Sequence, residues 1–104
     1  MAFVVSTDMP YFATIGGQST RGKAPAMYAY KTENTHATVD GSGYFNKLAN
    51  TLSIGDVILV EVVTNRGASN EALSTLGWHV VNANASGVVD CTNVSAITVS
   101  LDSD

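Results

Sequence analysis

Residues 57–63 (VILVEVV) constrain the fold of this chain more than any other stretch. Glu61 alone interrupts a run of valine, isoleucine and leucine. Residues of this kind are enriched in strands, and a nearly continuous apolar run is typical of a strand that is covered on both faces. We therefore expect a central strand here, with other segments supplying its neighbours and covering its two faces.

The segment before this strand predicts a short helix over residues 41–52. Its apolar residues recur at helical spacing and would form one stripe along the helix. They are Tyr44, Phe45, Leu48 and Leu52. Ser42 is a suitable residue to cap the first turn, and Gly55 with Asp56 predicts the turn into the strand.

Further short strands are expected at residues 3–5, 11–15, 27–32, 78–81, 88–91 and 97–101, where apolar residues cluster or alternate with polar ones. Pro10 confines the second of these to a sheet edge or to its own start. Residues 33–39 fit either one helical turn or a loop, and residues 64–77 fit a long loop with at most one helical turn. The pattern predicts an all-β fold, a small sandwich or barrel of about six or seven short strands with one short α-helix.

The chain has the length of one domain, at 104 residues. Residues 1–25 contain both prolines and a glycine-rich stretch, which predicts an N-terminal arm, with an edge hairpin as the alternative. Residues 26–104 are expected to form a single β domain.

The low charge of the chain bears on its partners. Charged residues make up 13% of the sequence and the net charge is −4, with five scattered Lys and Arg residues. This balance argues against nucleic-acid binding, whereas weak repulsion between copies favours association with other subunits. No apolar run reaches the roughly 18 residues of a membrane span, and no signal-peptide pattern opens the chain, so we expect no membrane contact and synthesis in a reducing cytoplasm.

The residues that could carry chemistry show no recognisable arrangement. His36 and His79 lack the spacing of a zinc motif, and we expect neither to converge with Cys91. Cys91 is expected to be a small buried residue, and His79 to be half exposed. GxSxG is absent, and Asp40, Asp56, Glu61 and Asp90 each have a structural role available. The sequence predicts no enzyme, no metal and no cofactor.

Aromatic residues leave one alternative function open. Trp78, Tyr28 and Tyr30 would suit a carbohydrate-binding β module if they formed a row that faces solvent. Tyr28, Tyr30 and Lys31 also resemble a fragment of a site for single-stranded nucleic acid, but the acidic balance argues against it. A hydrolase would need a serine or carboxylate paired with His36 or His79 in a cleft.

Four segments resemble a pattern found in small structural proteins of tailed bacteriophages. They are YAYKT at residues 28–32, ATV at 37–39, GYFN at 43–46 and LSIGDVI at 52–58, with a looser likeness in TLG at 75–77. Proteins with this pattern are head decoration (cement) or head-fibre proteins. The resemblance covers about residues 26–63, and residues 1–25 have no counterpart in it.

The resemblance implies a virion structural protein that binds the outer surface of the capsid. Its implied partner is the major capsid protein, and it implies a homo-oligomer, with a trimer favoured, that assembles in the host cytoplasm. No catalytic residue comes with it. From composition, we expect capsid or subunit contacts in the N-terminal arm and in the loop of residues 65–71. The candidates are Phe3, Val4, Tyr11, Phe12, Asn65, Arg66, Asn70 and Glu71.

Overall fold

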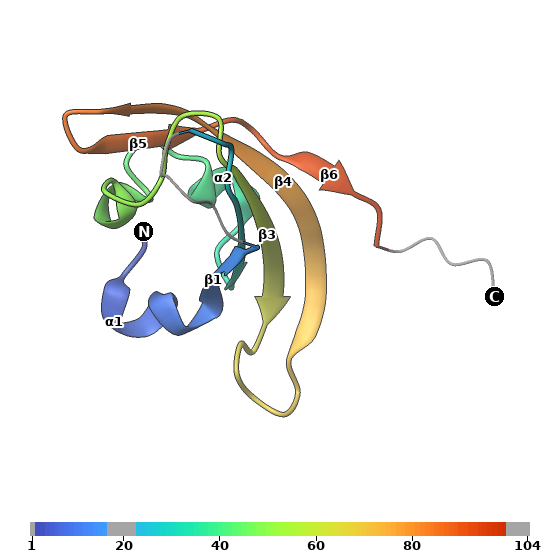
Figure 1. The fold of residues 1–104 in the computed structure, drawn as a ribbon. Helices are drawn as coiled ribbons and strands as arrows, with labels where there is room; N and C mark the ends of the chain where they lie inside the picture. Colours follow the sequence, from blue (N-terminus) through green and yellow to red (C-terminus); the bar gives the residue numbers. More distant parts are fainter. Residues whose placement is uncertain (1, 17–22, 100–104) are drawn as a thin grey trace.

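The structure is a computed structural model that describes residues 2–16 and 23–99 (Figure 1). Six strands and four short helical segments follow one another along the chain. In order they are α1 (Val5–Asp8), the 3₁₀ helix η1 (Met9–Tyr11), β1 (Phe12–Ile15), β2 (Met27–Thr32), α2 (His36–Val39), the 3₁₀ helix η2 (Asn46–Leu48), β3 (Val57–Thr64), β4 (Ala72–Ala85), β5 (Val88–Cys91) and β6 (Ser95–Ile97). The expected all-β class is confirmed.

The six strands form one mixed sheet in the order β1-β2-β3-β4-β5, with β6 also paired to β4. Strands β2 and β3 run parallel, and every other pair is antiparallel. A parallel pair needs a crossover of about a dozen residues or more. Residues 33–56 provide it and contain α2 and η2.

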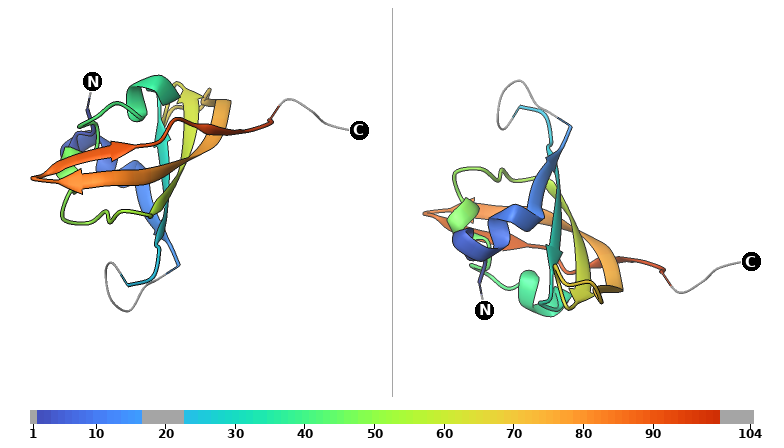
Figure 2. Two further views of the ribbon diagram at one scale, coloured as in Figure 1. Left: turned by 90° about the horizontal axis from the view of Figure 1, so that it is seen from above. Right: turned by 90° about the horizontal axis from the view of Figure 1, so that it is seen from below.

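The sheet curls because β4 is long and bent (Figure 1). Its 14 residues pair with β3 first and with β5 last, and the register shifts between Val81 and Ala83. Such irregularities increase the local bend of a strand. The curled sheet holds α1, α2 and the other helical segments on one side, as Figures 1 and 2 show together.

The core lies between the inner face of the sheet and these helical segments. Phe3, Tyr30 and Phe45 meet at its centre, with ring centroids 5.4 Å apart for Phe3 and Tyr30 and 5.9 Å apart for Phe3 and Phe45. Alternate residues of β2 and β3 point inward, including Tyr28, Tyr30, Ile58 and Val60, as strand geometry requires. The core therefore combines aromatic rings from β2 and from the helical side with the β-branched residues of β3.

Residues 41–52 do not form the predicted helix, although the apolar residues of its stripe are buried. Tyr44, Phe45, Leu48 and Leu52 are all in the core. The backbone turns at Gly43, whose φ of +90° is incompatible with a continuing α-helix, and only η2 is helical in the rest of the segment. Burial was predicted correctly because it follows from apolar composition, which does not depend on the helix.

Two other segments differ from the prediction. Residues 3–5 do not form a strand, because α1 begins at Val5 and Asp8 Oδ2 accepts a hydrogen bond of 2.8 Å from the backbone N–H of Val4. Residues 64–77 are not one long loop, because β4 begins at Ala72 and pairs with β3. The loop is confined to the hairpin end, where Asn65 and Gly67 take positive φ angles.

The strands predicted at residues 11–15, 27–32, 78–81 and 88–91 are confirmed, whereas the strand predicted at residues 97–101 shares only Ile97 with the observed one. β1 lies at the edge of the sheet directly after Pro10 and η1, and Ser86 with Gly87 turns β4 into β5. The C-terminal strand is shorter than expected, since β6 covers Ser95–Ile97, and residues 100–101 of the prediction lie outside the described residues.

Asp56 fixes the entrance to β3. Its side chain is buried, Oδ1 accepts from the Ala26 N–H at 3.0 Å, and Oδ2 accepts from the Ser53 N–H at 2.9 Å. Asp56→Ala leaves both donors without this acceptor, so we expect the free energy of unfolding to fall by about 2 kcal/mol. Urea denaturation measures it. Asp56→Asn keeps one acceptor oxygen and should lose about half as much; equal losses for the two variants would contradict this account.

Candidate functional site

The sheet has an outer face whose side chains point away from the core. Three rows of cross-strand neighbours define it. The first row is Ile15, Met27, Val57 and Val80; the second is Ala13, Ala29, Leu59, Trp78 and Ser95; the third is Lys31, Glu61, Leu76 and Ile97. Apart from Ser95 and the charged pair of the third row, every member is apolar.

No described segment forms a layer over this outer face. Ile15, Met27 and Val80 are 44%, 39% and 37% exposed, although they are large apolar residues. Val57, Leu59 and Trp78, which lie beside them, are partly exposed. The helical segments lie on the opposite side of the sheet (Figure 2), except that Pro10 and Tyr11 of η1 also line the edge of the outer face. The expectation that β3 is covered on both faces is not met by residues 2–16 and 23–99, which supply a single covering layer. An apolar surface of this kind marks an interaction site.

A hollow of about 350 Å³ lies at the third-row end of the outer face. Leu59 and Leu76 line its apolar part, and Lys31, Glu61 and Tyr11 line its polar part. Lys31 Nζ lies 2.8 Å from Glu71 Oε2 and 3.6 Å from Glu61 Oε1. The hydrogen bond that Lys31 donates to Glu71 raises the pKa of Lys31. The pKa of Glu71 is lowered, first by the hydrogen bond from the Gly67 N–H and then by Lys31. The lysine is thus matched by carboxylates of its own chain.

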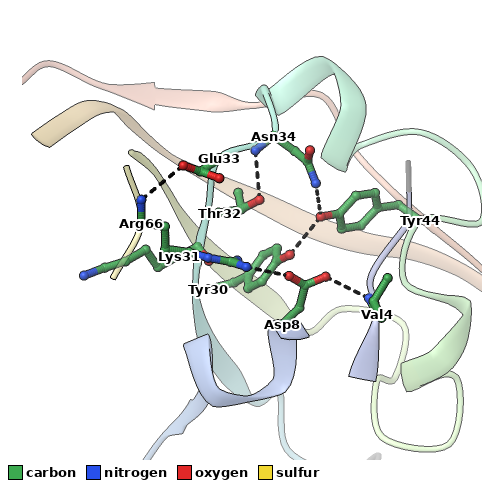
Figure 3. A network of polar contacts seen from close by, with 9 residues as sticks. All are labelled: Val4, Asp8, Tyr30, Lys31, Thr32, Glu33, Asn34, Tyr44 and Arg66. Atoms are coloured by element: carbon green, nitrogen blue, oxygen red, sulfur yellow. Dashed lines mark hydrogen bonds and ion pairs between the residues drawn. The ribbon is translucent and has the colours of Figure 1, made fainter. Parts of the chain in front are cut away.

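A second polar cluster joins the N-terminal segment to the β3–β4 hairpin (Figure 3). Arg66 Nη2 donates to Asp8 Oδ1 at 2.9 Å, and Nη1 donates to the Lys31 carbonyl at 3.0 Å. The guanidinium also lies 4.1 Å from the ring centroid of Tyr11, a favourable cation–π geometry. The Asp8 and Arg66 side chains are only 11% and 15% exposed, so this ion pair is part of the packed structure.

Two tyrosines extend this cluster into the core (Figure 3). The Tyr30 and Tyr44 hydroxyls lie 2.8 Å apart, and Asn34 Nδ2 donates to the Tyr44 oxygen at 2.7 Å. Burial, followed by the hydrogen bond with Tyr44, raises the pKa of Tyr30. A small hollow of about 210 Å³ lies beside the cluster. The charged groups of the polar cluster are paired with one another, so the cluster is suited to holding segments of the chain together.

The two histidines meet, a contact that the sequence did not predict. His36 Nδ1 lies 3.0 Å from His79 Nε2, and the rings stack with centroids 5.1 Å apart. The prediction that His79 is half exposed is also wrong, because it shares the inner face with Ile58, its partner in β3, and is fully buried. Burial, followed by the nearby His79, lowers the pKa of His36. Nothing local in the sequence brings residues 36 and 79 together.

Neither a metal site nor a thiol nucleophile forms around these residues. Within residues 2–16 and 23–99, no three His, Cys, Asp or Glu side chains gather closely enough to hold a metal ion. Cys91 is buried, as expected, and its burial raises the pKa of the thiol to about 12. A thiol in that state does not act as a nucleophile at neutral pH.

The residues predicted as contacts are divided between core and surface. Phe3 is 1% exposed, so the structure corrects the prediction for this residue: its ring fills the aromatic core. Phe12 packs against that core, and Tyr11, Arg66 and Glu71 take part in the polar clusters. Val4, Asn65 and Asn70 are exposed.

The aromatic row required by a carbohydrate module is not present. Tyr28 and Tyr30 are 3% and 1% exposed and point to the core, whereas Trp78 lies on the outer face beside Leu59. The alternation of side chains along strands places them on opposite faces. The same alternation separates the three residues that resembled a site for single-stranded nucleic acid, because Tyr28 and Tyr30 point to the core and Lys31 lies on the outer face.

The outer face was missed although the sequence contains a signal for it. Residues 57–63 are apolar on both faces, and so are residues 76–81, in which Leu76, Trp78 and Val80 alternate with inward-pointing residues. A second apolar face indicates a second covering layer, whether from the same chain or from another.

Among the residues described, no helix is long and apolar enough to cross a membrane. Comparison with known proteins finds no protein family, curated protein or solved structure that matches this chain.

Proposed function

We propose that this protein is a structural protein that works by association, with the outer face of its sheet as the contact surface. The observation that carries the proposal is that β3 is apolar on both faces while the described part of the chain covers only one of them. A neighbouring molecule that covers the outer face would bury Met27, Leu59 and Val80. At about 25 cal/mol per Å² of apolar surface, such burial is a substantial driving force for association.

The occupant that we propose for the outer face is a second copy of this chain. The chain carries a net charge of −4, so copies repel one another over most of their surface. Among the residues of the three rows, only Lys31 and Glu61 are charged, and Lys31 also lies 2.8 Å from Glu71, so these three side chains together carry one negative charge. The outer face is therefore where two like-charged copies meet with least repulsion.

The resemblance of residues 26–63 to phage head proteins makes this proposal more specific. We propose a capsid decoration (cement) protein bound to the major capsid protein on the outer surface of the virion. The resemblance favours a homotrimer, in which the outer face of one copy would contact a different surface of the next copy, because a face that meets itself closes a dimer. The exposed Val4, Asn65 and Asn70 are the proposed capsid contacts. Binding to the expanded shell alone would stabilise that state by linkage, and several contacts at once would add avidity, with no catalytic step.

Charge placed on the outer face should abolish self-association. Val80→Glu adds a carboxylate to an exposed position of the first row, where burial against a second copy would strand an unpaired charge. We expect the dissociation constant between copies to rise more than about 100-fold, which corresponds to about 2.7 kcal/mol. Light scattering over a concentration series measures it.

Ile54→Glu is the matched control, because Ile54 is 67% exposed in the turn before β3 and lies outside the three rows. It should leave association unchanged. A wild-type chain that stays monomeric, or two variants that behave alike, would show that the outer face is not a self-association surface.

The decoration role has its own test. Sedimentation with purified expanded capsids of the protein's own source should give co-migration at a ratio that is a multiple of the capsid symmetry. Asn70→Lys combined with Val4→Glu should reduce capsid binding and leave the oligomer intact, because both residues lie outside the outer face. An oligomer that ignores these capsids would contradict the decoration role and leave self-association standing.

A further inference from the structure

The contact between the two histidines has a defined direction. His79 Nδ1 lies 3.0 Å from the carbonyl oxygen of Thr92, which only accepts hydrogen bonds. His79 must therefore carry its proton on Nδ1, and its Nε2 is an acceptor in the neutral ring. Because His36 Nδ1 lies 3.0 Å from that Nε2, His36 must donate from Nδ1.

This arrangement leaves His36 Nε2 without a proton, so the atom is a hydrogen-bond acceptor. The atom is buried and has no hydrogen-bond partner among the described residues. A neutral acceptor is tolerated there, but an N–H at the same atom would be a buried donor without an acceptor. The pair is thus satisfied only when both rings are neutral.

Any added proton creates that unpaired donor. If His36 takes it directly, the proton sits on Nε2. If His79 takes it on Nε2, that atom becomes a donor, and His36 must accept at Nδ1 and move its own proton to Nε2. Both routes end with an N–H at His36 Nε2, and a proton on each ring would also place two cations 3.0 Å apart.

The titratable groups near the pair come from two elements, α2 and β5. Asp40 follows α2, and its carboxylate favours the protonated form of His36. Asp90 and Cys91 lie on β5, next to the strand that carries His79. The net effect on His36 is a lowered pKa, so burial and the nearby His79 together outweigh the opposite effect of Asp40. The polar neighbours Thr35 and Thr38 bond to each other and carry no charge.

We infer that His36 and His79 form a proton-operated latch, which holds α2 against β4 when both rings are neutral and releases it at mildly acidic pH. The latch closes one side of the core, because Val39 of α2 is fully buried and is exposed when the segment opens. Tyr44 and Phe45 follow on the same crossover, so the released segment adjoins the aromatic core.

The sign of the pH effect follows from linkage. His36 binds a proton less readily in the closed state than in the open state, where its pKa is near the ordinary value of about 6.5. The closed state is therefore favoured above about pH 6.5, and the preference is lost as the pH falls below that value. Between pH 7.5 and 5.5 the opening constant should rise about tenfold for one proton taken up.

Two measurements on the whole protein test the latch. At pH 7.5, ¹⁵N spectra of the imidazoles should show protons on Nδ1 of both rings; an Nε2–H on either ring would overturn the assignment. Hydrogen exchange, corrected for intrinsic rates, should show protection of the Val39 and Asp40 amides falling about tenfold between pH 7.5 and 5.5. Protection of the β3 amides should stay constant; no change in α2, or an equal loss in β3, would refute the latch.

Two variants identify the group that takes up the proton. His36→Asn keeps an N–H donor in place of Nδ1 but has no titratable ring, so α2 should lose its pH response and stay closed. Asp40→Asn removes the neighbouring carboxylate and should keep the response. A response that persists in His36→Asn, or that disappears in Asp40→Asn, would contradict the proposal.

Discussion

Phe3→Ala is expected to lower the free energy of unfolding by about 4 kcal/mol, the middle of the range for removal of a buried aromatic ring. The ring is 1% exposed and packs against Phe12, Tyr30 and Phe45. The cavity would open at the centre of a core that a small domain cannot easily rearrange. Urea denaturation followed by tryptophan fluorescence measures the change, since the chain has one Trp.

Val4→Ala provides the matched control, because Val4 is the next residue and its side chain is 48% exposed. It should cost less than about 0.5 kcal/mol. If Phe3→Ala were as mild as Val4→Ala, the first residues would be a dispensable arm, as the sequence suggested. A large loss in Phe3→Ala alone would make them an integral part of the core.

Asp8→Ala is expected to cost about 3 kcal/mol, because it leaves the largely buried guanidinium of Arg66 without its carboxylate. The same change removes the acceptor of the Val4 N–H at the start of α1. The remaining exposure of the two side chains, 11% and 15%, keeps the expected cost at the low end for buried pairs. Thermal and urea unfolding report it.

The double variant Asp8→Ala with Arg66→Met separates a stranded charge from lost packing. Methionine fills part of the space of the arginine stem without a charge, so the double variant should be more stable than Asp8→Ala alone by about 1 kcal/mol. Stability losses that simply add would show that the two side chains act independently, contrary to their contact in the structure.

The strands were predictable from the sequence where local chemistry decides the outcome. The alternation in residues 27–32 and the apolar run of residues 57–63 indicate strands without reference to the rest of the chain. The burial of Leu48 and Leu52 also followed from their apolar character. The helix predicted around them failed because the backbone at Gly43 turns to positive φ, which glycine permits and the spacing of apolar residues does not report.

The candidate sites were harder to predict because they depend on contacts between distant segments. The pairing of His36 with His79 requires the crossover that makes β2 and β3 parallel, and no local pattern indicates that crossover. Likewise, Phe3 reaches the core because α1 and η1 turn the first residues back over the sheet. The sequence does indicate that the sheet has a second apolar face, but it does not indicate what covers that face.

The parallel pairing of β2 with β3 sets the order in which this chain can fold on the ribosome. β1 and β2 leave the ribosome first, yet the only partner of β2 other than β1 is β3, which follows a crossover of residues 33–56. β3 in turn pairs with β4, so the first third of the chain cannot complete its sheet pairing until the C-terminal half has been synthesised. Long-range pairings of this kind slow folding, and the rate-limiting step should come after synthesis is nearly complete.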